Sequence, residues 1–183
     1  MTPGSGRHVV LVGMMGSGKT TVGRRVAKVL GRPFVDADEA FIARFGRTVA
    51  AAFADDGEDG FRALEAELLA ELIDVPDPLV IATGGGVVVR EENRKRLADP
   101  DVFVVLLHAE PAFLASRTTE AAHRPLLADG DLAAVLQRLH DERIGWYQEV
   151  ADEVLEVASF HEWGSSPKRA MAARIAARVG EPT

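Results

Sequence analysis

Eight residues, Gly13 to Thr20 (GMMGSGKT), have the types and spacing of a phosphate-binding loop. They satisfy the pattern G-x-x-x-x-G-K-[ST] between an apolar run and a stretch of helical period. Glycines let successive backbone N–H groups turn toward phosphate oxygens, and the N-terminus of the following helix adds further N–H groups. Lys19 would place a positive charge on the β- and γ-phosphates, and the Thr20 hydroxyl can ligate Mg²⁺. The segment therefore predicts a site for a nucleoside triphosphate.

The rest of the chain narrows the class of nucleotide-binding protein. No guanine-reading N-K-x-D segment, as a GTP switch would have, follows a later apolar run. The run Leu79–Gly86 (LVIATGGG) ends in glycines, where large ATPases usually carry an acidic residue. Glycines there either let backbone N–H groups approach a small polar substrate or form a flexible turn. Both features favour a small phosphotransferase.

Two aspartates in "PFVDAD", Asp36 and Asp38, could handle a metal ion and a substrate hydroxyl. Residues two apart on an extended strand share a face, and both side chains would leave toward the carboxyl edge of the sheet. One carboxylate can hold Mg²⁺ through water, and the other can orient a hydroxyl for attack. The alternative is that Asp38 caps the helix that begins at "EAFIARF".

Several arginines could bind anionic groups of the ligands. Arg62 and Glu65 lie one helical turn apart, which fits either a surface ion pair or an Arg fork that Glu65 holds toward a substrate carboxylate. Arg117 and Arg124 lie in "SRTTEAAHRPLLADGD" (116–131), which fits either a lid that closes on the γ-phosphate or a solvated loop. Arg143 alone would be interpreted as a cation near a helix end.

Histidines give no such signal. His108 and His123 have no partner at metal-ligand spacing in the sequence, and no role is predicted for them.

The elements that must position these residues are short apolar strands separated by helices. The runs at 8–13, 33–38, 79–84, 102–107 and 153–158 are nearly continuous in hydrophobicity, as in strands covered on both faces. Between them, apolar residues such as Val22, Val26, Val29 and Leu30 recur at helical spacing. This alternation predicts a single doubly wound α/β domain with a mainly parallel sheet over residues 8–183.

Composition limits the class of partner and the location. The 183 residues include 47% hydrophobic residues, no cysteine and a net charge of −7, which argues against a general nucleic-acid binder. No apolar run reaches the roughly 20 residues that span a bilayer. Residues 1–7 lack the apolar core of a secretory signal and are expected to form a flexible tail. We expect a cytoplasmic protein with no membrane partner.

Taken together and in this order, the segments resemble the shikimate kinase family. The resemblance covers roughly residues 8–180 and rests on the P-loop with "TTVGRRVAKVLGRPFVDAD", on "GRTVAAAFADDGEDGFRALE", "ATGGG" and "RPLL", and on an Arg before a Tyr and "EVAD". It implies a P-loop fold of the nucleoside-monophosphate-kinase type with a five-stranded parallel sheet, a substrate-binding region at about 36–65 and a lid at about 116–130. It also implies a monomer that uses ATP and Mg²⁺ to phosphorylate the 3-hydroxyl of shikimate in aromatic amino-acid biosynthesis.

The resemblance also implies roles for individual residues. Thr20 would ligate Mg²⁺ with Asp36 assisting through water, and Asp38 would bind the substrate hydroxyls and help to remove the proton. Arg62 and Arg143 would hold the shikimate carboxylate beside Gly84, Gly85 and Gly86. Arg124 would act with Lys19 on the transferring phosphoryl group, and Arg117 would lie against the adenine. The ATP phosphates would be held by Gly16, Ser17, Gly18, Lys19, Thr20 and Thr21.

Two departures from the family pattern accompany these expectations. "RIGWY" places Gly145 and Trp146 where the family commonly has Pro and Leu, and "SSP" (165–167) keeps a proline without the arginine of the adenine site. The alternatives are a related kinase of another carboxylated polyol, such as gluconate or a cyclitol, and a nucleotide-binding module without catalysis.

Overall fold

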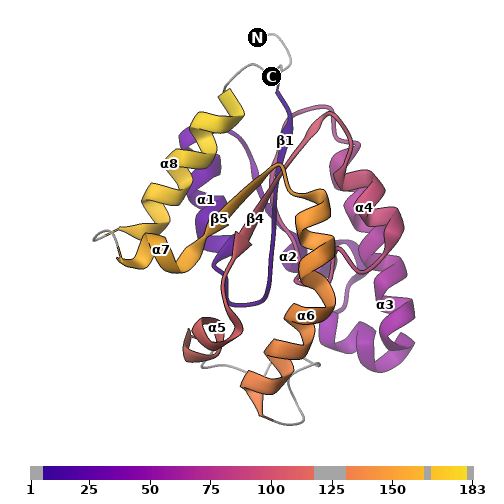
Figure 1. Cartoon of the computed structure of the whole chain (residues 1–183). Coiled ribbons are helices and arrows are strands. Elements are labelled where there is room, and N and C mark those ends of the chain that lie inside the picture. The colour runs from indigo at the N-terminus through magenta and orange to yellow at the C-terminus, as the bar shows by residue number, and fades with distance from the viewer. Residues whose placement is uncertain (1–5, 118–130, 163–165, 181–183) are drawn as a thin grey trace.

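The computed structural model describes residues 6–117, 131–162 and 166–180. Within them, strands and helices alternate along the chain, as expected (Figure 1). The strands are β1 (His8–Val12), β2 (Phe34–Asp36), β3 (Val80–Ala82), β4 (Val102–His108) and β5 (Glu153–Glu156). The helices are α1 (Lys19–Leu30), α2 (Ala37–Phe45), α3 (Val49–Ile73), α4 (Glu91–Leu97), α5 (Pro111–Arg117), α6 (Leu132–Val150), α7 (Val157–Glu162) and α8 (Pro167–Gly180).

The five strands form one parallel sheet in the order β2-β3-β1-β4-β5. The chain passes from β1 to the far edge at β2 and returns through β3 to β4, so the direction of winding reverses beside β1. In open α/β sheets, ligands bind at the carboxyl ends of the strands where this reversal occurs. The topology therefore predicts a ligand-binding site among the loops that follow β1, β2 and β3.

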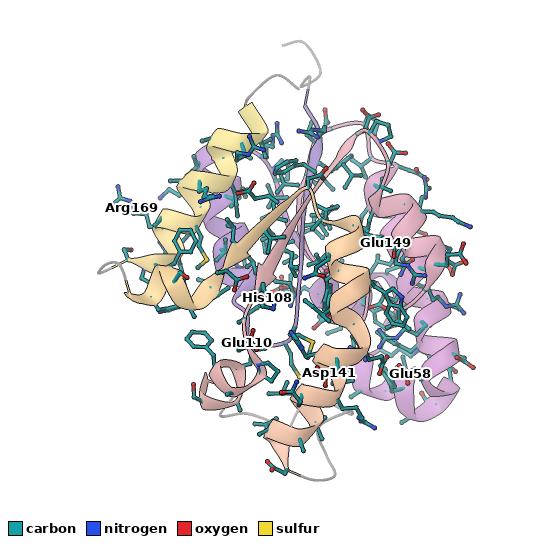
Figure 2. All side chains as sticks on the ribbon, viewed as in Figure 1. Glu58, His108, Glu110, Asp141, Glu149 and Arg169 are labelled. Atoms are coloured by element: carbon teal, nitrogen blue, oxygen red, sulfur yellow. The ribbon has the colours of Figure 1, made fainter. Side chains whose placement is uncertain are left out.

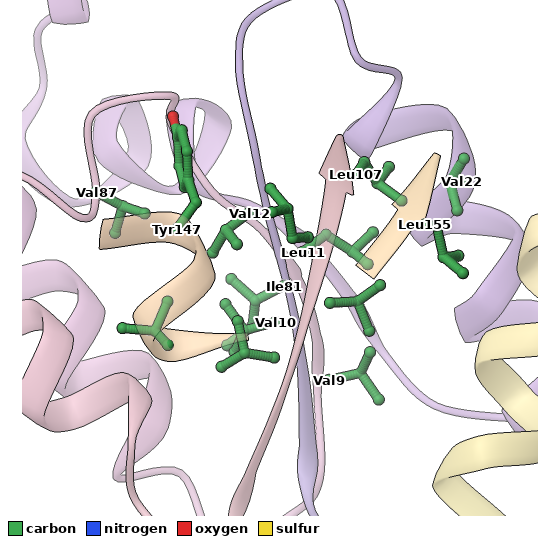
Figure 3. Packing of buried hydrophobic residues seen from close by; sticks show 14 of the residues in the cluster. Val9, Val10, Leu11, Val12, Val22, Ile81, Val87, Leu107, Tyr147 and Leu155 are labelled. Atoms are coloured by element: carbon green, nitrogen blue, oxygen red, sulfur yellow. The ribbon is translucent and has the colours of Figure 1, made fainter. Parts of the chain in front are cut away.

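Helices cover both faces of the sheet, which explains the continuous apolar runs of the strands. Helices α1 and α8 lie on one face, and α4 and α6 lie on the other (Figure 1). Every residue of β1 is buried. In Figure 3, Val9 and Leu11 point toward the side of Val22 from α1, whereas Val10 and Val12 point toward the side of Tyr147 from α6. A strand that is buried on both faces has no solvent-facing side, so its sequence does not alternate between apolar and polar residues.

A second, smaller core lies beneath the segment expected to bind substrate. Phe41 of α2 packs with Ala52, Phe61 and Leu68 of α3. The ring centroids of Phe41 and Phe61 are 5.4 Å apart, and those of Phe53 and Phe61 are 4.4 Å apart. This cluster holds α2 and α3 together at the carboxyl edge of the sheet.

Helical periodicity identified the buried faces with one exception. Val22 and Val26 of α1 are fully buried, but Val29, in the last turn of that helix, is 60% exposed. Among the described helices, none combines the length and the apolar composition that crossing a bilayer requires.

Candidate active site

The loop between β1 and α1 has the backbone geometry of a phosphate cradle. Gly13, Gly16 and Gly18 all adopt positive φ angles, of 135°, 82° and 95°. A Cβ atom on Gly13 would lie 2.5 Å from the carbonyl oxygen of Leu107 in β4, so this position has no room for a side chain. Only glycine adopts such conformations without strain. The glycine pattern therefore corresponds to a specific loop shape that ends at the N-terminus of α1.

The side chain of Lys19 folds back over this loop. Its Nζ donates hydrogen bonds to the carbonyl oxygens of Gly13 (2.7 Å) and Met14 (2.9 Å), and the residue is only 9% exposed. The ammonium group is thus held at the mouth of the loop, at the place where the backbone turns. An anion bound by the loop would meet this charge.

Thr20, at the N-terminus of α1, contacts Asp36, at the end of β2. The Thr20 hydroxyl donates to Asp36 Oδ2 at 2.7 Å. A hydroxyl beside a carboxylate is a pair of hard oxygen ligands of the kind that Mg²⁺ accepts, and Mg²⁺ sites on nucleotides commonly use only one or two protein groups. The described residues contain no group of three or more His, Cys, Asp or Glu side chains placed to hold a metal. The donor set of Thr20 and Asp36 therefore fits an ion that is bound mainly through nucleotide phosphates and water.

The two aspartates do not share a face of a strand, which corrects the geometry expected from sequence. β2 ends at Asp36, and Asp38 lies in the first turn of α2. Asp36 caps this helix, because its Oδ1 accepts a hydrogen bond from the Asp38 backbone N–H at 3.1 Å. Helix capping is thus present, but the capping residue is Asp36, and the expected extended conformation at Asp38 was wrong. Both side chains still line one cleft.

This cleft has a volume of about 350 Å³ and collects most of the predicted residues. It is lined by the phosphate-binding loop, by α2 and α3, by the glycines after β3 and by one residue of α6. The predicted site residues on its wall are Gly16, Gly18, Lys19, Thr20, Thr21, Asp36, Asp38, Arg62, Gly84, Gly85, Gly86 and Arg143. A size of this order suits a small ligand.

Arg62 enters the cleft from α3 as a buried guanidinium group. The helix is interrupted at Gly57 (φ 71°, ψ −178°), one turn before Arg62. Nη1 of Arg62 donates to Glu65 at 2.7 Å and Nη2 donates to Glu58 at 3.2 Å. The Arg62 side chain is 6% exposed, so the fork that Glu65 was expected to hold is present and is not a surface ion pair.

Two of the three glycines after β3, Gly84 and Gly86, make room for charged side chains. A Cβ on Gly86 would overlap the Arg62 guanidinium group, and a Cβ on Gly84 would lie 2.9 Å from Glu65 Oε1. The sequence argument assigned the glycines to close approach of a substrate. The close approach in the structure is that of Arg62 and Glu65, which in turn line the cleft.

Arg143 reaches the same glycine segment from α6. Its Nη1 donates to the carbonyl oxygen of Gly85 at 3.1 Å, and the residue is 2% exposed. Tyr147, one helical turn later, also donates its hydroxyl to the Gly85 oxygen. Arg143 therefore does not cap a helix end, since α6 continues to Val150 and its guanidinium group faces the cleft.

Charges within the cleft influence one another. Burial raises the pKa of the Glu65 carboxyl above its ordinary value, Arg62 opposes this shift, and the nearby Asp38 carboxylate adds to it. The Nε atoms of Arg62 and Arg143 are buried and have no hydrogen-bond partner among the described residues. Buried N–H donors without acceptors are costly, and the two guanidinium groups bring positive charge to the wall of the cleft, where it would favour an anion.

Sequence analysis assigned no role to Tyr147 or Glu58, which hold the cleft arginines and their neighbours in place. Tyr147 had a usable signal, because it lies four residues after Arg143 and so on the same helical face. Glu58 also lies four residues from Arg62. In the sequence, however, nothing distinguished Glu58 from the other acidic residues of "ADDGEDG".

Three predicted residues are not on the wall of the cleft: Ser17 is buried within the loop, and Arg117 and Arg124 cannot be located there. Arg124 lies outside the described residues, and so do most of the predicted lid (116–130) and His123. Arg117 ends α5, but its side chain is also outside the described part of the structure. Of "SSP", Pro167 begins α8.

Fold and site together define a class of enzyme. A parallel sheet in the order 2-3-1-4-5, a glycine loop with Lys and Thr after β1, and a polar cleft beside it with buried arginines are the features of a P-loop kinase of the nucleoside-monophosphate-kinase type.

Comparison with known proteins identifies the family. The model of the shikimate kinase family matches residues 15–178. Shikimate kinase from Dechloromonas aromatica is 45% identical over 150 residues, which cover 82% of this chain and 81% of that protein. The chain therefore belongs to the shikimate kinase family, whose members are transferases of aromatic amino-acid biosynthesis. The family, fold and enzyme class expected from sequence are confirmed.

Solved structures agree with this assignment. Shikimate kinase from Acinetobacter baumannii in complex with shikimate superposes with a TM-score of 0.84 at 36% identity, covering 93% of this chain and 91% of that one. A gluconokinase from Sinorhizobium meliloti superposes with a TM-score of 0.53 at 20% identity, covering 94% of each chain, which shows a shared fold alone.

Proposed function

We propose that this member of the shikimate kinase family transfers the γ-phosphoryl group of ATP to the 3-hydroxyl group of shikimate, with Mg²⁺ as the metal. The observation that carries the proposal is a pair of buried arginines, Arg62 and Arg143, on either side of the glycine segment 84–86 and next to a phosphate-binding loop. Shikimate offers one carboxylate for the arginines and hydroxyl groups for an aspartate.

The nucleotide end of the cleft would hold the phosphates through the loop backbone. N–H groups from Gly16 to Thr21 and the Lys19 ammonium group would neutralise the phosphate charge. Thr20 and Asp36 would hold Mg²⁺, which supplies charge stabilisation to the phosphates when bound. Arg124 and Arg117 are proposed, from family resemblance alone, to contact the transferring phosphoryl group and the adenine.

The acceptor end would fix the substrate by its carboxylate. Arg62 and Arg143 both line the cleft, and a substrate carboxylate would accept hydrogen bonds from guanidinium N–H groups that the protein does not use. Asp38, on the wall between the two ends, would accept a hydrogen bond from the attacking hydroxyl and take its proton. Phosphoryl transfer depends mainly on this positioning and on charge neutralisation.

The experiment that tests the proposal measures ADP formation by the purified chain with shikimate, gluconate or a cyclitol as the acceptor. We expect shikimate alone to stimulate ADP formation strongly. Stimulation by gluconate and not by shikimate would identify a polyol kinase of the same fold. ATP binding without turnover on any acceptor would identify a module without catalysis.

A variant pair tests the carboxylate site itself. Arg62→Ala should raise the KM for shikimate by about a hundredfold, because a buried charged hydrogen bond contributes about 1.5–3 kcal/mol, and should leave ATP binding nearly unchanged. Arg44→Ala removes an exposed arginine that pairs with Glu71 outside the cleft and serves as the control. An unchanged KM in Arg62→Ala would refute the carboxylate clamp.

The remaining expectations are proposals of the same kind. We propose a cytoplasmic monomer whose partners are shikimate and ATP, without nucleic-acid or membrane partners. The net charge of −7 supports the first of these exclusions.

A further inference from the structure

We propose that His108 and His140 form a binding site for a transition-metal dication of the zinc type, separate from the candidate active site. His108 is the last residue of β4, and His140 lies in the middle of α6, which packs near that strand. Neither residue lines the cleft. Figure 2 places His108 at the carboxyl end of β4 and Asp141, the neighbour of His140, on α6.

The two imidazole rings face each other through their Nε2 atoms. These atoms are 3.3 Å apart, and the ring centroids are 5.6 Å apart with the rings tilted by 48°. Zinc binds histidine nitrogens at about 2.0–2.1 Å with tetrahedral geometry, so two nitrogens on one ion lie about 3.3–3.4 Å apart. The observed separation, which also allows a hydrogen bond between the rings, therefore matches that of two ligands of a single metal ion.

A carboxylate lies at the opposite side of each ring, beside its Nδ1 atom. His108 Nδ1 lies 2.7 and 2.8 Å from the two oxygens of Glu156, and His140 Nδ1 lies 3.3 Å from Asp141 Oδ1. A carboxylate only accepts hydrogen bonds, so the short contacts with Glu156 place the proton of His108 on Nδ1 and direct its Nε2 lone pair toward His140. Nε2 of His140 can donate a hydrogen bond to Nε2 of His108 in the metal-free protein, and its proton would leave when a metal ion binds both nitrogens.

The partner of His108 is held by the sheet itself. His108 and Glu156 are directly opposite each other in the β4–β5 ladder, so backbone register fixes the pair. A carboxylate that accepts from the Nδ1–H of a metal-binding histidine orients the ring and increases its basicity. The side chains of His108 and His140 are 16% and 13% exposed, so both are largely buried but reachable from solvent.

The ligand chemistry selects the class of metal. Imidazole nitrogens favour zinc, nickel and copper, whereas Mg²⁺ prefers oxygen ligands. The described residues provide no third His, Cys, Asp or Glu positioned for a metal, so water would complete the coordination. The site is thus chemically distinct from the oxygen pair of Thr20 and Asp36.

Zinc titration of the untagged, EDTA-treated full chain, without nucleotide, tests the proposal by calorimetry. We expect saturable binding of one Zn²⁺ per chain, and Co²⁺ should give a visible absorption band at the same stoichiometry. His108→Gln and His140→Gln should each abolish this binding. His123→Gln and His161→Gln are the matched controls, and circular dichroism checks the fold of every variant.

A further variant does not alter either proposed ligand. Glu156→Gln changes a side chain that is 55% exposed and should weaken zinc binding by about 10–100-fold, the usual effect of losing a partner of a metal-bound histidine. In the wild-type chain, zinc should also shift the imidazole ¹⁵N resonances of both histidines. Absence of saturable binding, which would mean that the two imidazoles only form a hydrogen bond with each other, overturns the proposal. So does zinc binding that persists in folded His108→Gln or His140→Gln, or two wild-type imidazoles that do not respond to zinc.

Discussion

The guanidinium group of Arg62 occupies the space that a Cβ atom on Gly86 would fill. Arg62 comes from α3 and Gly86 from the turn after β3, so the contact fixes α3, part of the region proposed to bind substrate, against the end of the sheet. The stacked rings of Phe53 and Phe61 lie on one side of the guanidinium group, with centroids 5.7 and 5.2 Å from its Cζ. Because these contacts hold its side chain in place, Arg62 can present N–H donors that Glu58 and Glu65 do not use to the cleft without searching among rotamers.

Gly86→Ala should therefore impair shikimate binding by displacing Arg62. We expect kcat/KM for shikimate to fall by about tenfold or more, a loss of about 1.4 kcal/mol of transition-state binding, and the KM for ATP to stay nearly constant. Overpacking should also lower the free energy of unfolding by about 1–3 kcal/mol. Steady-state kinetics with each substrate varied and urea unfolding measure the two effects. Unaltered shikimate kinetics would contradict the steric role of Gly86.

The same contact illustrates what sequence could and could not predict. Three consecutive glycines after an apolar strand indicate a close approach, because a Cβ is excluded there. They do not say which group approaches, and the group beside Gly86 is Arg62 of the protein. The arginine lies 24 residues earlier in the chain, and no local pattern links the two.

Local sequence patterns also predicted which strands and helices form better than they predicted where each one ends. Continuous apolar runs gave the parallel sheet, since burial on both faces leaves no alternation. The end of β2 was placed two residues too late, because Asp is compatible both with a strand end and with a helix N-cap. His108 and His140 were missed for a related reason: 32 residues separate them, and only the packing of α6 near β4 brings them together.

Asp36→Asn should separate the capping role of Asp36 from its proposed metal role. Asn caps helices as well as Asp does, so the free energy of unfolding should change by less than about 0.5 kcal/mol. Loss of the negative charge should raise the Mg²⁺ concentration needed for half-maximal activity by about tenfold. Activity measured against free Mg²⁺ at constant ATP tests this expectation.

Asp131→Asn is the matched control for that variant. Asp131 caps α6 by accepting from the Ala133 backbone N–H at 3.0 Å, and it does not line the cleft. Its Mg²⁺ requirement should equal that of the wild type. If Asp36→Asn behaved like Asp131→Asn, then Asp36 would be a helix cap alone.

Tyr147 should make the folded state sensitive to alkaline pH. Burial raises the pKa of its hydroxyl above the ordinary value, with Arg143 partly opposing the shift. The unfolded chain loses this proton first, near pH 10, so stability falls as the pH rises above about 10. Between about pH 10 and pH 11 the loss should be about 1 kcal/mol, and Tyr147→Phe should remove this part of the decline.

Urea unfolding of the wild type and of Tyr147→Phe at matched pH values measures that difference. Tyr147 is the one tyrosine in the sequence, so phenolate absorbance reports its ionisation directly. Parallel stability curves for the two proteins above pH 10 would mean that the hydroxyl ionises as easily in the folded state as in the unfolded one.

Gly145, one of the two departures in "RIGWY", should be replaceable by alanine with a gain in stability. It lies inside α6, it is exposed, and a Cβ at this position would meet no heavy atom within 4 Å. Glycine in a helix interior costs about 1 kcal/mol relative to alanine, because it has more backbone freedom to lose on folding. Gly145→Ala should therefore raise the free energy of unfolding by about 1 kcal/mol and the Tm by about 2–4 °C.

Kinetics on the same variant decide whether that glycine also serves the site. Gly145 lies two residues from both Arg143 and Tyr147, which hold the carbonyl oxygen of Gly85. If α6 acts as a rigid support, the KM for shikimate will stay within about twofold of the wild type, because alanine leaves the helical backbone unchanged. A stabilised variant with a much higher KM would instead mean that α6 must bend at Gly145 when the substrate carboxylate binds Arg143.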